Sequence, residues 1–123
     1  MQTLVVAVYP GAPTSVDAIV AGVSVRAEWV GIPPTAGEVV DVELDIDAVL
    51  GWGETIAIDG TEMTLRQGPL LRGTVEIHEQ ELLTVRVGEG LVTIEVDDGS
   101  KDVPAGTGIV VVAEHSKLYP TGV

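Results

Sequence analysis

The chain has 123 residues, contains neither cysteine nor phenylalanine, and carries a formal net charge of −13. The missing cysteine excludes disulfide bonds and thiolate metal sites, and the length suits one domain with its own core. No apolar run approaches the roughly 20 residues of a membrane helix, and the N-terminal residues lack the pattern of a secretory signal, so we expect a soluble, cytoplasmic protein. The negative field disfavours nucleic acid and favours basic partners.

Short segments of alternating apolar and polar residues, separated by Gly, Pro and Asp, recur along the whole chain. This pattern predicts an all-β fold over residues 1–123, a single small barrel or closed sandwich of about eight to nine short, mostly antiparallel strands. The predicted strands, in chain order, are Thr3–Val8, Ile19–Trp29, Glu38–Leu50, Thr55–Ile58, Glu62–Arg66, Gly73–His78, Leu82–Val87, Leu91–Val96 and Gly108–Ala113.

The predicted strand Ile19–Trp29 is long and has Gly22 in its interior. A mid-strand glycine is typical of a kink that lets one strand serve both sides of a small barrel. The polar face of this strand carries Arg26, which we expect to pair with carboxylates of the next strand.

The next strand has carboxylates at every second position, and the residues between them are apolar. Because side chains on a strand alternate between faces, the apolar residues predict a core-facing side and the carboxylates a negatively charged surface. The carboxylates are Asp41, Glu43, Asp45 and Asp47, and the apolar residues are Val40, Val42, Leu44 and Ile46. This row is either a solvated face or a docking surface for a basic partner; a straight strand spreads its carboxylates too widely to wrap a calcium ion.

The alternation breaks after Val49, in a segment that contains Gly51-Trp52-Gly53. Trp52 either plugs one end of the barrel or lies exposed as the anchor of an interface. Three hairpin turns are predicted beyond it, at Asp59-Gly60, at residues 79–81 and at residues 88–90.

No segment of the sequence groups residues for catalysis. Residues 97–102 (Asp-Asp-Gly-Ser-Lys-Asp) lack the twelfth-position Glu of a calcium loop and predict a turn, and neither His78 nor His115 has an evident nucleophile or acid partner. The sequence therefore predicts a protein that is not an enzyme and has no cofactor or metal.

A long strand with a central glycine (Gly22), followed by strands that meander and close, resembles the OB-fold over roughly residues 15–115. The resemblance implies a small closed barrel. OB-folds that bind nucleic acid carry stacking aromatics and basic residues on their binding face, whereas this chain has four aromatic and six basic residues in all. The resemblance therefore predicts the fold of this chain, and it does not predict binding to nucleic acid.

Three functions remain open at this stage. The first is a non-enzymatic binding module whose acidic row, with Trp52, meets a basic protein partner, as an inhibitor, an immunity-type protein or a nucleic-acid mimic would. The second is a structural subunit of a homo-oligomer or phage-like assembly that associates through exposed strand edges. The third is a barrel that binds a small ligand at its mouth near Trp52.

Overall fold

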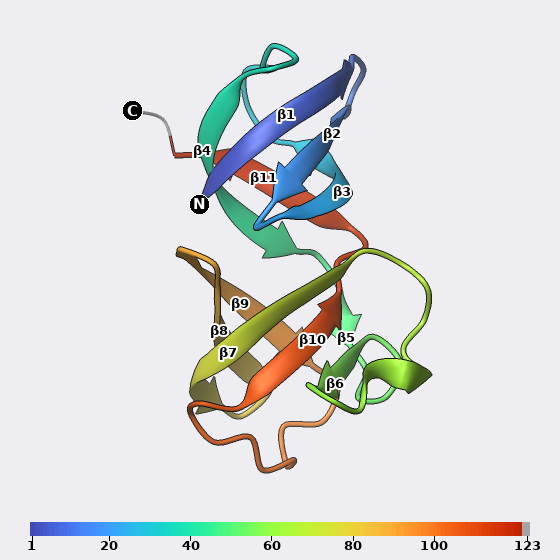
Figure 1. Cartoon of the computed structure of the whole chain (residues 1–123), viewed down its shortest axis with the longest axis vertical. Helices are drawn as coiled ribbons and strands as arrows, with labels where there is room; N and C mark the ends of the chain where they lie inside the picture. The colour runs from blue at the N-terminus through green and yellow to red at the C-terminus, as the bar shows by residue number, and fades with distance from the viewer. Residues whose placement is uncertain (122–123) are drawn as a thin grey trace.

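The structure, a computed structural model, describes residues 1–121 and is built almost entirely of β-strands (Figure 1). The prediction of an all-β fold with a small closed barrel is confirmed. The strands are β1 (Gln2–Tyr9), β2 (Thr14–Val20), β3 (Val23–Trp29), β4 (Val39–Ile46), β5 (Val49–Leu50), β6 (Ile56–Ile58), β7 (Leu70–Glu79), β8 (Leu82–Val87), β9 (Gly90–Val96), β10 (Gly108–Val112) and β11 (Ser116–Pro120). None of the residues from 1 to 121 belongs to a helix long and apolar enough to cross a membrane.

The strands form two sheets that lie one above the other in Figure 1. One is a closed barrel with the order β1-β2-β3-β11-β4, and the other is a six-stranded sheet with the order β5-β9-β8-β7-β10-β6. The chain passes from barrel to sheet after β4 and returns after β10, so β11 closes the barrel between β3 and β4. β11 runs parallel to β3 and antiparallel to β4.

The predicted strand Ile19–Trp29 is two strands, and the expected kink at Gly22 is wrong. β2 and β3 form an antiparallel hairpin in which Val20 pairs with Val23, and Ala21 and Gly22 make the turn with φ values of 48° and 79°. Positive φ at both central residues gives the twist that joins two strands by two residues. Gly22 therefore reverses the chain instead of bending it.

The acidic strand alternates as predicted. Val42, Leu44 and Ile46 are buried in the barrel, while Asp41 and Glu43 are exposed on its outer wall. The predicted strand Glu38–Leu50 nevertheless divides after Ile46, because Val49 and Leu50 pair with β9 of the second sheet.

The second sheet contains two of the three predicted hairpins. β7 and β8 turn at Gln80–Glu81, and β8 and β9 turn at Gly88–Glu89. The predicted hairpin at Asp59-Gly60 is wrong, because β6 pairs with β10. The predicted strand Glu62–Arg66 is also wrong, because Glu62–Thr64 form a short 3₁₀ helix, η1.

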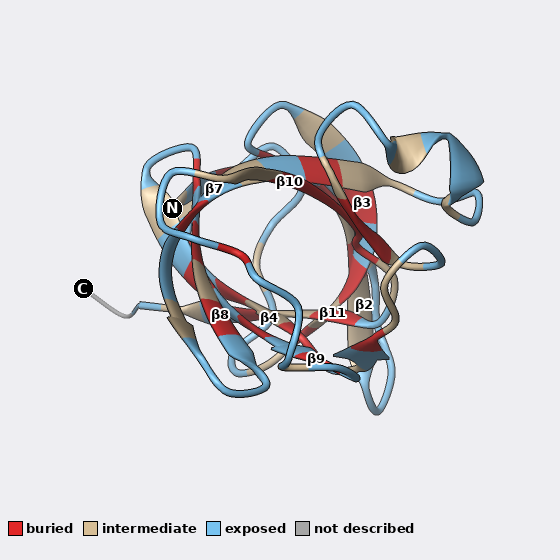
Figure 2. Cartoon of the chain, turned by 90° about the horizontal axis from the view of Figure 1, so that it is seen from below, coloured by how far each residue is buried: buried red, intermediate tan, exposed pale blue. Residues whose placement is uncertain are grey.

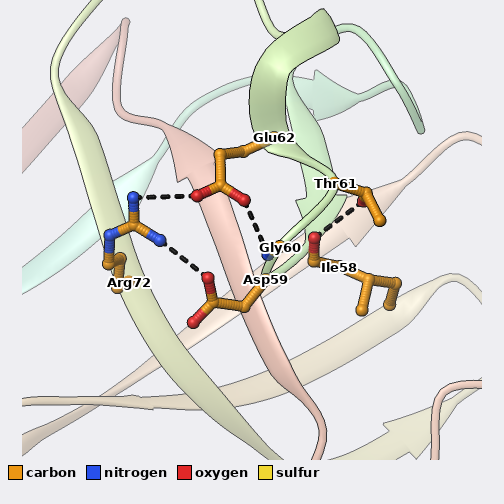
Figure 3. Close-up of polar contacts among 6 residues, drawn as sticks. All are labelled: Ile58, Asp59, Gly60, Thr61, Glu62 and Arg72. Atoms are coloured by element: carbon orange, nitrogen blue, oxygen red, sulfur yellow. Dashed lines mark hydrogen bonds and ion pairs between the residues drawn. The ribbon is translucent and has the colours of Figure 1, made fainter.

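Arg72 holds this turn against the sheet (Figure 3). Its guanidinium lies 2.8 Å from Asp59 Oδ1 and 3.0 Å from Glu62 Oε2, and the other Glu62 oxygen accepts a hydrogen bond from Gly60 N at 2.6 Å. The backbone N–H of Glu62 first, and then Arg72, hold the pKa of this carboxyl below its usual value. These ion pairs therefore hold the turn against β7. The sequence had predicted that the residues after the turn form a strand paired with the one before it.

Buried apolar residues of the barrel and of the second sheet form one continuous core. Seen along the long axis, the buried residues lie on the inner side of the strands and the exposed residues lie outside (Figure 2). Val and Leu dominate this core, as expected for a chain without phenylalanine.

Candidate functional site

The outward face of β4 lies beside the outward face of β9, and together they line a groove. Glu43, Asp45, Leu91, Thr93 and Tyr119 line one cavity of about 470 Å³. Asp45 and Thr93 also line the adjoining cavity of about 320 Å³, which continues past Asp47 to Glu95. We call this groove the acidic trough; its walls are Glu43, Asp45 and Asp47 on β4 and the segment after it, and Leu91, Thr93 and Glu95 on β9.

Apolar side chains lie exposed along the acidic trough. Leu91 is 53% exposed, Leu82 of β8 is 46% exposed and Tyr119 of β11 is 37% exposed. Leu82 pairs with Glu95, and Tyr119 pairs with Glu43, so these two apolar side chains stand beside a carboxylate, whereas Leu91 pairs with Arg86. In a protein interface, apolar surface of this kind gives contact area and neighbouring charge gives orientation.

Three trough carboxylates form no ion pair in the described part of the chain, although Lys117 is the cross-strand neighbour of Asp45. Within residues 1–121, no basic group lies within 4 Å of Glu43, Asp45 or Glu95. Asp47 is the exception, because Lys117 Nζ lies 3.1 Å from its Oδ2. That hydrogen bond raises the pKa of Lys117. The acidic trough therefore contains three carboxylates that form no ion pair within residues 1–121 and one, Asp47, that does.

Two expectations for the acidic row change. Asp41 is not part of the acidic trough: its carboxylate lies 2.5 Å from the α-amino group of Met1, whose hydrogen bond lowers the pKa of Asp41. Arg26 does not pair with the row, because β11 lies between β3 and β4. Arg26 instead bonds Asp17 across the β2–β3 hairpin and lies 4.3 Å from the ring centre of Tyr9, whose hydroxyl donates to the same carboxylate at 2.6 Å.

Trp52 lies apart from the acidic trough, in the segment between β5 and β6. It is partly buried and packs against the core, and its Nε1 donates to the carbonyl of Asp98 at 3.2 Å. Lys101 Nζ stands 5.2 Å from the ring centre, and both residues line a separate cavity of about 360 Å³. Trp52 therefore lies beside the second sheet, between β5 and β6, and both interpretations of it, barrel plug and interface anchor, stay predictions.

His78 and the acidic turn make local hydrogen bonds. His78 Nε2 lies 2.9 Å from the carbonyl of Gln80, and its neighbour Glu76 pairs with Arg86. In the predicted turn at residues 97–102, Asp98 accepts hydrogen bonds from the N–H and hydroxyl of Ser100, at 2.9 and 2.6 Å. Over the part of the chain that the structure describes, no three His, Asp or Glu side chains are grouped as a metal site would need.

No family model matches the chain, and neither the curated proteins nor the solved structures contain a similar one. The acidic trough therefore has to be interpreted from its own geometry. Sequence reasoning found its β4 wall and missed its β9 wall, where Leu91 and Glu95 stand on the outward face of a correctly predicted strand. The available signal was the apolar residue Leu91 at an outward position, which does not single out a site because exposed apolar residues are common on these strands.

Proposed function

We propose that this chain is a non-enzymatic binding module and that the acidic trough captures a basic protein partner. The observation that carries the proposal is a set of carboxylates that form no ion pair within residues 1–121, on facing walls of one groove: Glu43, Asp45 and Glu95. A basic partner would supply the missing charge, and the exposed Leu91 and Tyr119 would supply apolar contact area.

Charge distribution over the whole molecule supports the same proposal. Of the six basic side chains, five form ion pairs, and Lys101 stands over Trp52. A net charge of −13 speeds the approach of a basic partner and repels nucleic acid. An inhibitor, an immunity-type protein or a nucleic-acid mimic that works in the cytoplasm would have this charge.

The OB-fold resemblance gains support from the barrel and belongs to the proposal. The order β4-β1-β2-β3 is that of a Greek key, and the OB-fold is a five-stranded Greek-key barrel. The second sheet, which lies in sequence between β4 and β11, departs from that simple pattern. The acidic trough lies where this additional sheet meets the barrel.

A test compares two double variants of equal charge. Glu43→Lys with Glu95→Lys changes both walls of the acidic trough, whereas Glu54→Lys with Asp102→Lys changes exposed carboxylates outside it. The immobilised chain is used to recover a partner from a cell extract at low salt, and binding is then measured with the purified partner. We expect the first variant to lose binding by at least about tenfold and the second to keep it. Equal binding by both variants contradicts the proposal.

Self-assembly is a second candidate, supported by an apolar patch on the barrel wall. Leu4 pairs with Ile19 on one side and with Val39 on the other, and all three side chains are exposed. An uncharged patch of this kind suits contact between two copies of an acidic chain. Light scattering after size exclusion tests it: an assembly that Leu4→Lys converts to monomer supports self-assembly, and a monomeric wild-type chain contradicts it.

A further inference from the structure

The barrel and the second sheet repeat one arrangement of strands. In the barrel, β1, β2 and β3 pair in sequence and β4 returns to pair with β1; in the second sheet, β7, β8 and β9 pair in sequence and β10 returns to pair with β7. β2 begins at Thr14 and β8 at Leu82, and β4 begins at Val39 and β10 at Gly108, so corresponding strands lie 68 or 69 residues apart in the chain. Both sets of four strands therefore have the order of a Greek key.

Local irregularities recur at corresponding positions of the two sets. The ladder between β1 and β2 shifts its register between Val5 and Ala7, and the ladder between β7 and β8 does so between Val75 and Ile77. A bulge at one position of a ladder is a specific feature of a fold, so its recurrence in the same place is not expected of two unrelated sheets.

The turn that leads into the fourth strand is also repeated. Gly37, before β4, and Gly106, before β10, have φ values of 90° and 93°. Gly37 N bonds the carbonyl of Val5 at 2.7 Å, and Gly106 N bonds that of Val75 at 2.8 Å. Val5 and Val75 are the residues at which the two register shifts begin. Residues 1–58 and 70–120 therefore fold as two copies of one structural unit.

The fifth strand of each set comes from the other half of the chain. β11 follows β10 of the lower sheet in Figure 1, yet it lies in the upper barrel, parallel to β3 and antiparallel to β4. In the second sheet, β5 is parallel to β9 and β6 is antiparallel to β10, so these two short strands, which follow β4, take the same position. The match extends to one hydrogen bond, because Val30 N bonds the carbonyl of Leu118 at 3.0 Å and Asp97 N bonds that of Leu50 at 2.9 Å. Each half of the chain therefore forms four strands of its own set and gives a fifth strand to the other.

The connection between β10 and β11 is short and contains a strained residue. β10 ends at Val112 and β11 begins at Ser116, so three residues make the passage from the second sheet to the barrel. One of them, His115, has a φ of 55°, in the left-handed region that is unfavourable for a residue with a Cβ. A short connection under strain favours exchange of a strand between copies of a chain, because an extended connection releases the strain.

We propose that the position between β3 and β4 is an interface for a second copy of this chain, from which it accepts β11 as the chains fold. Each set of strands already receives its fifth strand from the other half, so closing the barrel with the β11 of another copy changes only the connection. β11 would keep the same pairs with β3 and β4, and Leu118 would stay buried. Exchange of this kind joins two copies at low cost, because no new packing has to form. The outward carboxylates of β4 stay in place, so this inference goes beyond the proposed function and does not depend on it.

Since the chain contains no cysteine, single introduced cysteines can show which strands meet. Glu43 of β4 and Tyr119 of β11 are paired and exposed, and paired Cα atoms about 5.5 Å apart lie within disulfide range. A chain with Glu43→Cys and a chain with Tyr119→Cys are unfolded together in urea, refolded at high protein concentration and oxidised. Because only exchange makes the two cysteines strand partners across copies, we expect a disulfide-linked dimer of twice the mass.

The matched control uses two strands that exchange of β11 leaves in the same copy. Ser15 of β2 and Glu28 of β3 are partners in a hairpin, and chains with Ser15→Cys and Glu28→Cys are mixed and refolded in the same way. For each pair, one chain that carries both cysteines should close an internal disulfide, which checks its folding and geometry. Asp45→Cys and Lys117→Cys, the neighbouring pair of β4 and β11, give a second and independent measurement of exchange.

The yields of linked dimer decide the proposal. Dimer in the β4–β11 mixtures and not in the β2–β3 mixture, formed only after refolding, supports exchange. Yields from the β4–β11 mixtures that do not exceed those of the control overturn it. Equal yields from folded chains mixed without urea also overturn it, because that result shows contact between folded surfaces.

Discussion

Leu118 gives the sharpest test of how the two sheets depend on each other. It is fully buried in β11, the strand that closes the barrel, and it pairs with Trp29 on one side and Leu44 on the other. Leu118→Ala leaves a void between two strands that are fixed by their ladders, so little collapse is available to fill it. We expect the free energy of unfolding to fall by about 3–4 kcal/mol, within the range for buried Leu→Ala changes.

That loss is large for a chain of this size. A domain of 123 residues has a total stability of roughly 6–18 kcal/mol. The unfolding entropy is about 0.26 kcal/mol per kelvin, so the melting temperature should fall by about 12–15 °C. Tyr119→Ala, at the next and partly exposed position of β11, is the matched control, and its expected cost is below about 1 kcal/mol.

The assay is urea unfolding followed at two places in the molecule. Trp29 reports on the barrel in a Trp52→Phe background, and Trp52 reports on the second sheet in a Trp29→Phe background. Because one apolar core spans both sheets, Leu118→Ala should lower both midpoints together. A loss below about 1 kcal/mol, or a shift of the Trp29 transition alone, would refute the argument and show two independent units.

Two further predictions concern the turn at Gly99 and the loss of stability at low pH. Gly99→Ala should lower the free energy of unfolding, measured by chemical denaturation, by about 1–3 kcal/mol, because the new Cβ would overlap the main chain of Gln80 and Glu81. The control is Gly106→Ala, which has open space around it and should cost only the strain of its positive φ. Equal losses in the two variants would contradict this prediction. Hydrogen bonds from Arg26 first, and then from Tyr9, lower the pKa of Asp17, so its contribution to stability is present above pH 4 and lost as the pH falls through the folded-state pKa. Melting temperatures of Asp17→Asn from pH 5 to pH 2 should therefore fall less steeply than those of the wild type, and parallel curves would exclude Asp17 from the acid transition.

The fold could be predicted from the sequence where a strand and its neighbour are joined by a short turn. β8 and β9 alternate cleanly and meet at Gly88, so their positions and register follow from local pattern. The β2–β3 hairpin was missed because apolar residues continue through its two-residue turn and look like one strand. The core-facing positions are even-numbered before the turn and odd-numbered after it. β11 was missed because its short sequence contains Lys117, Tyr119 and Pro120, and its strand conformation depends on pairing with distant partners.

Only the β4 wall of the candidate site was predicted, because the other wall depends on pairing between segments that are distant in the sequence. The β4 wall is a local pattern, and its charged face could be predicted from alternation alone. The β9 wall follows almost fifty residues later, and only the pairing of β5 with β9 brings Leu91 and Glu95 opposite the carboxylates. No property of either segment by itself indicates that the two face each other.

Closure of a barrel removes strand edges, and this explains why the acidic trough lies at the junction. The barrel pairs its strands in a ring, and the second sheet ends in the two short strands β5 and β6. Within residues 1–121, β1 pairs with β4 only from Val39 to Asp41, and β5 pairs with β9 only at Glu95 and Val96. An open edge attracts any strand, including one from another copy of the chain, and charge beside the edge decides which strand is accepted. Carboxylates at this place would repel a second copy of this acidic chain and, under the proposed function, attract a basic partner, so the same residues would disfavour self-association and favour that partner.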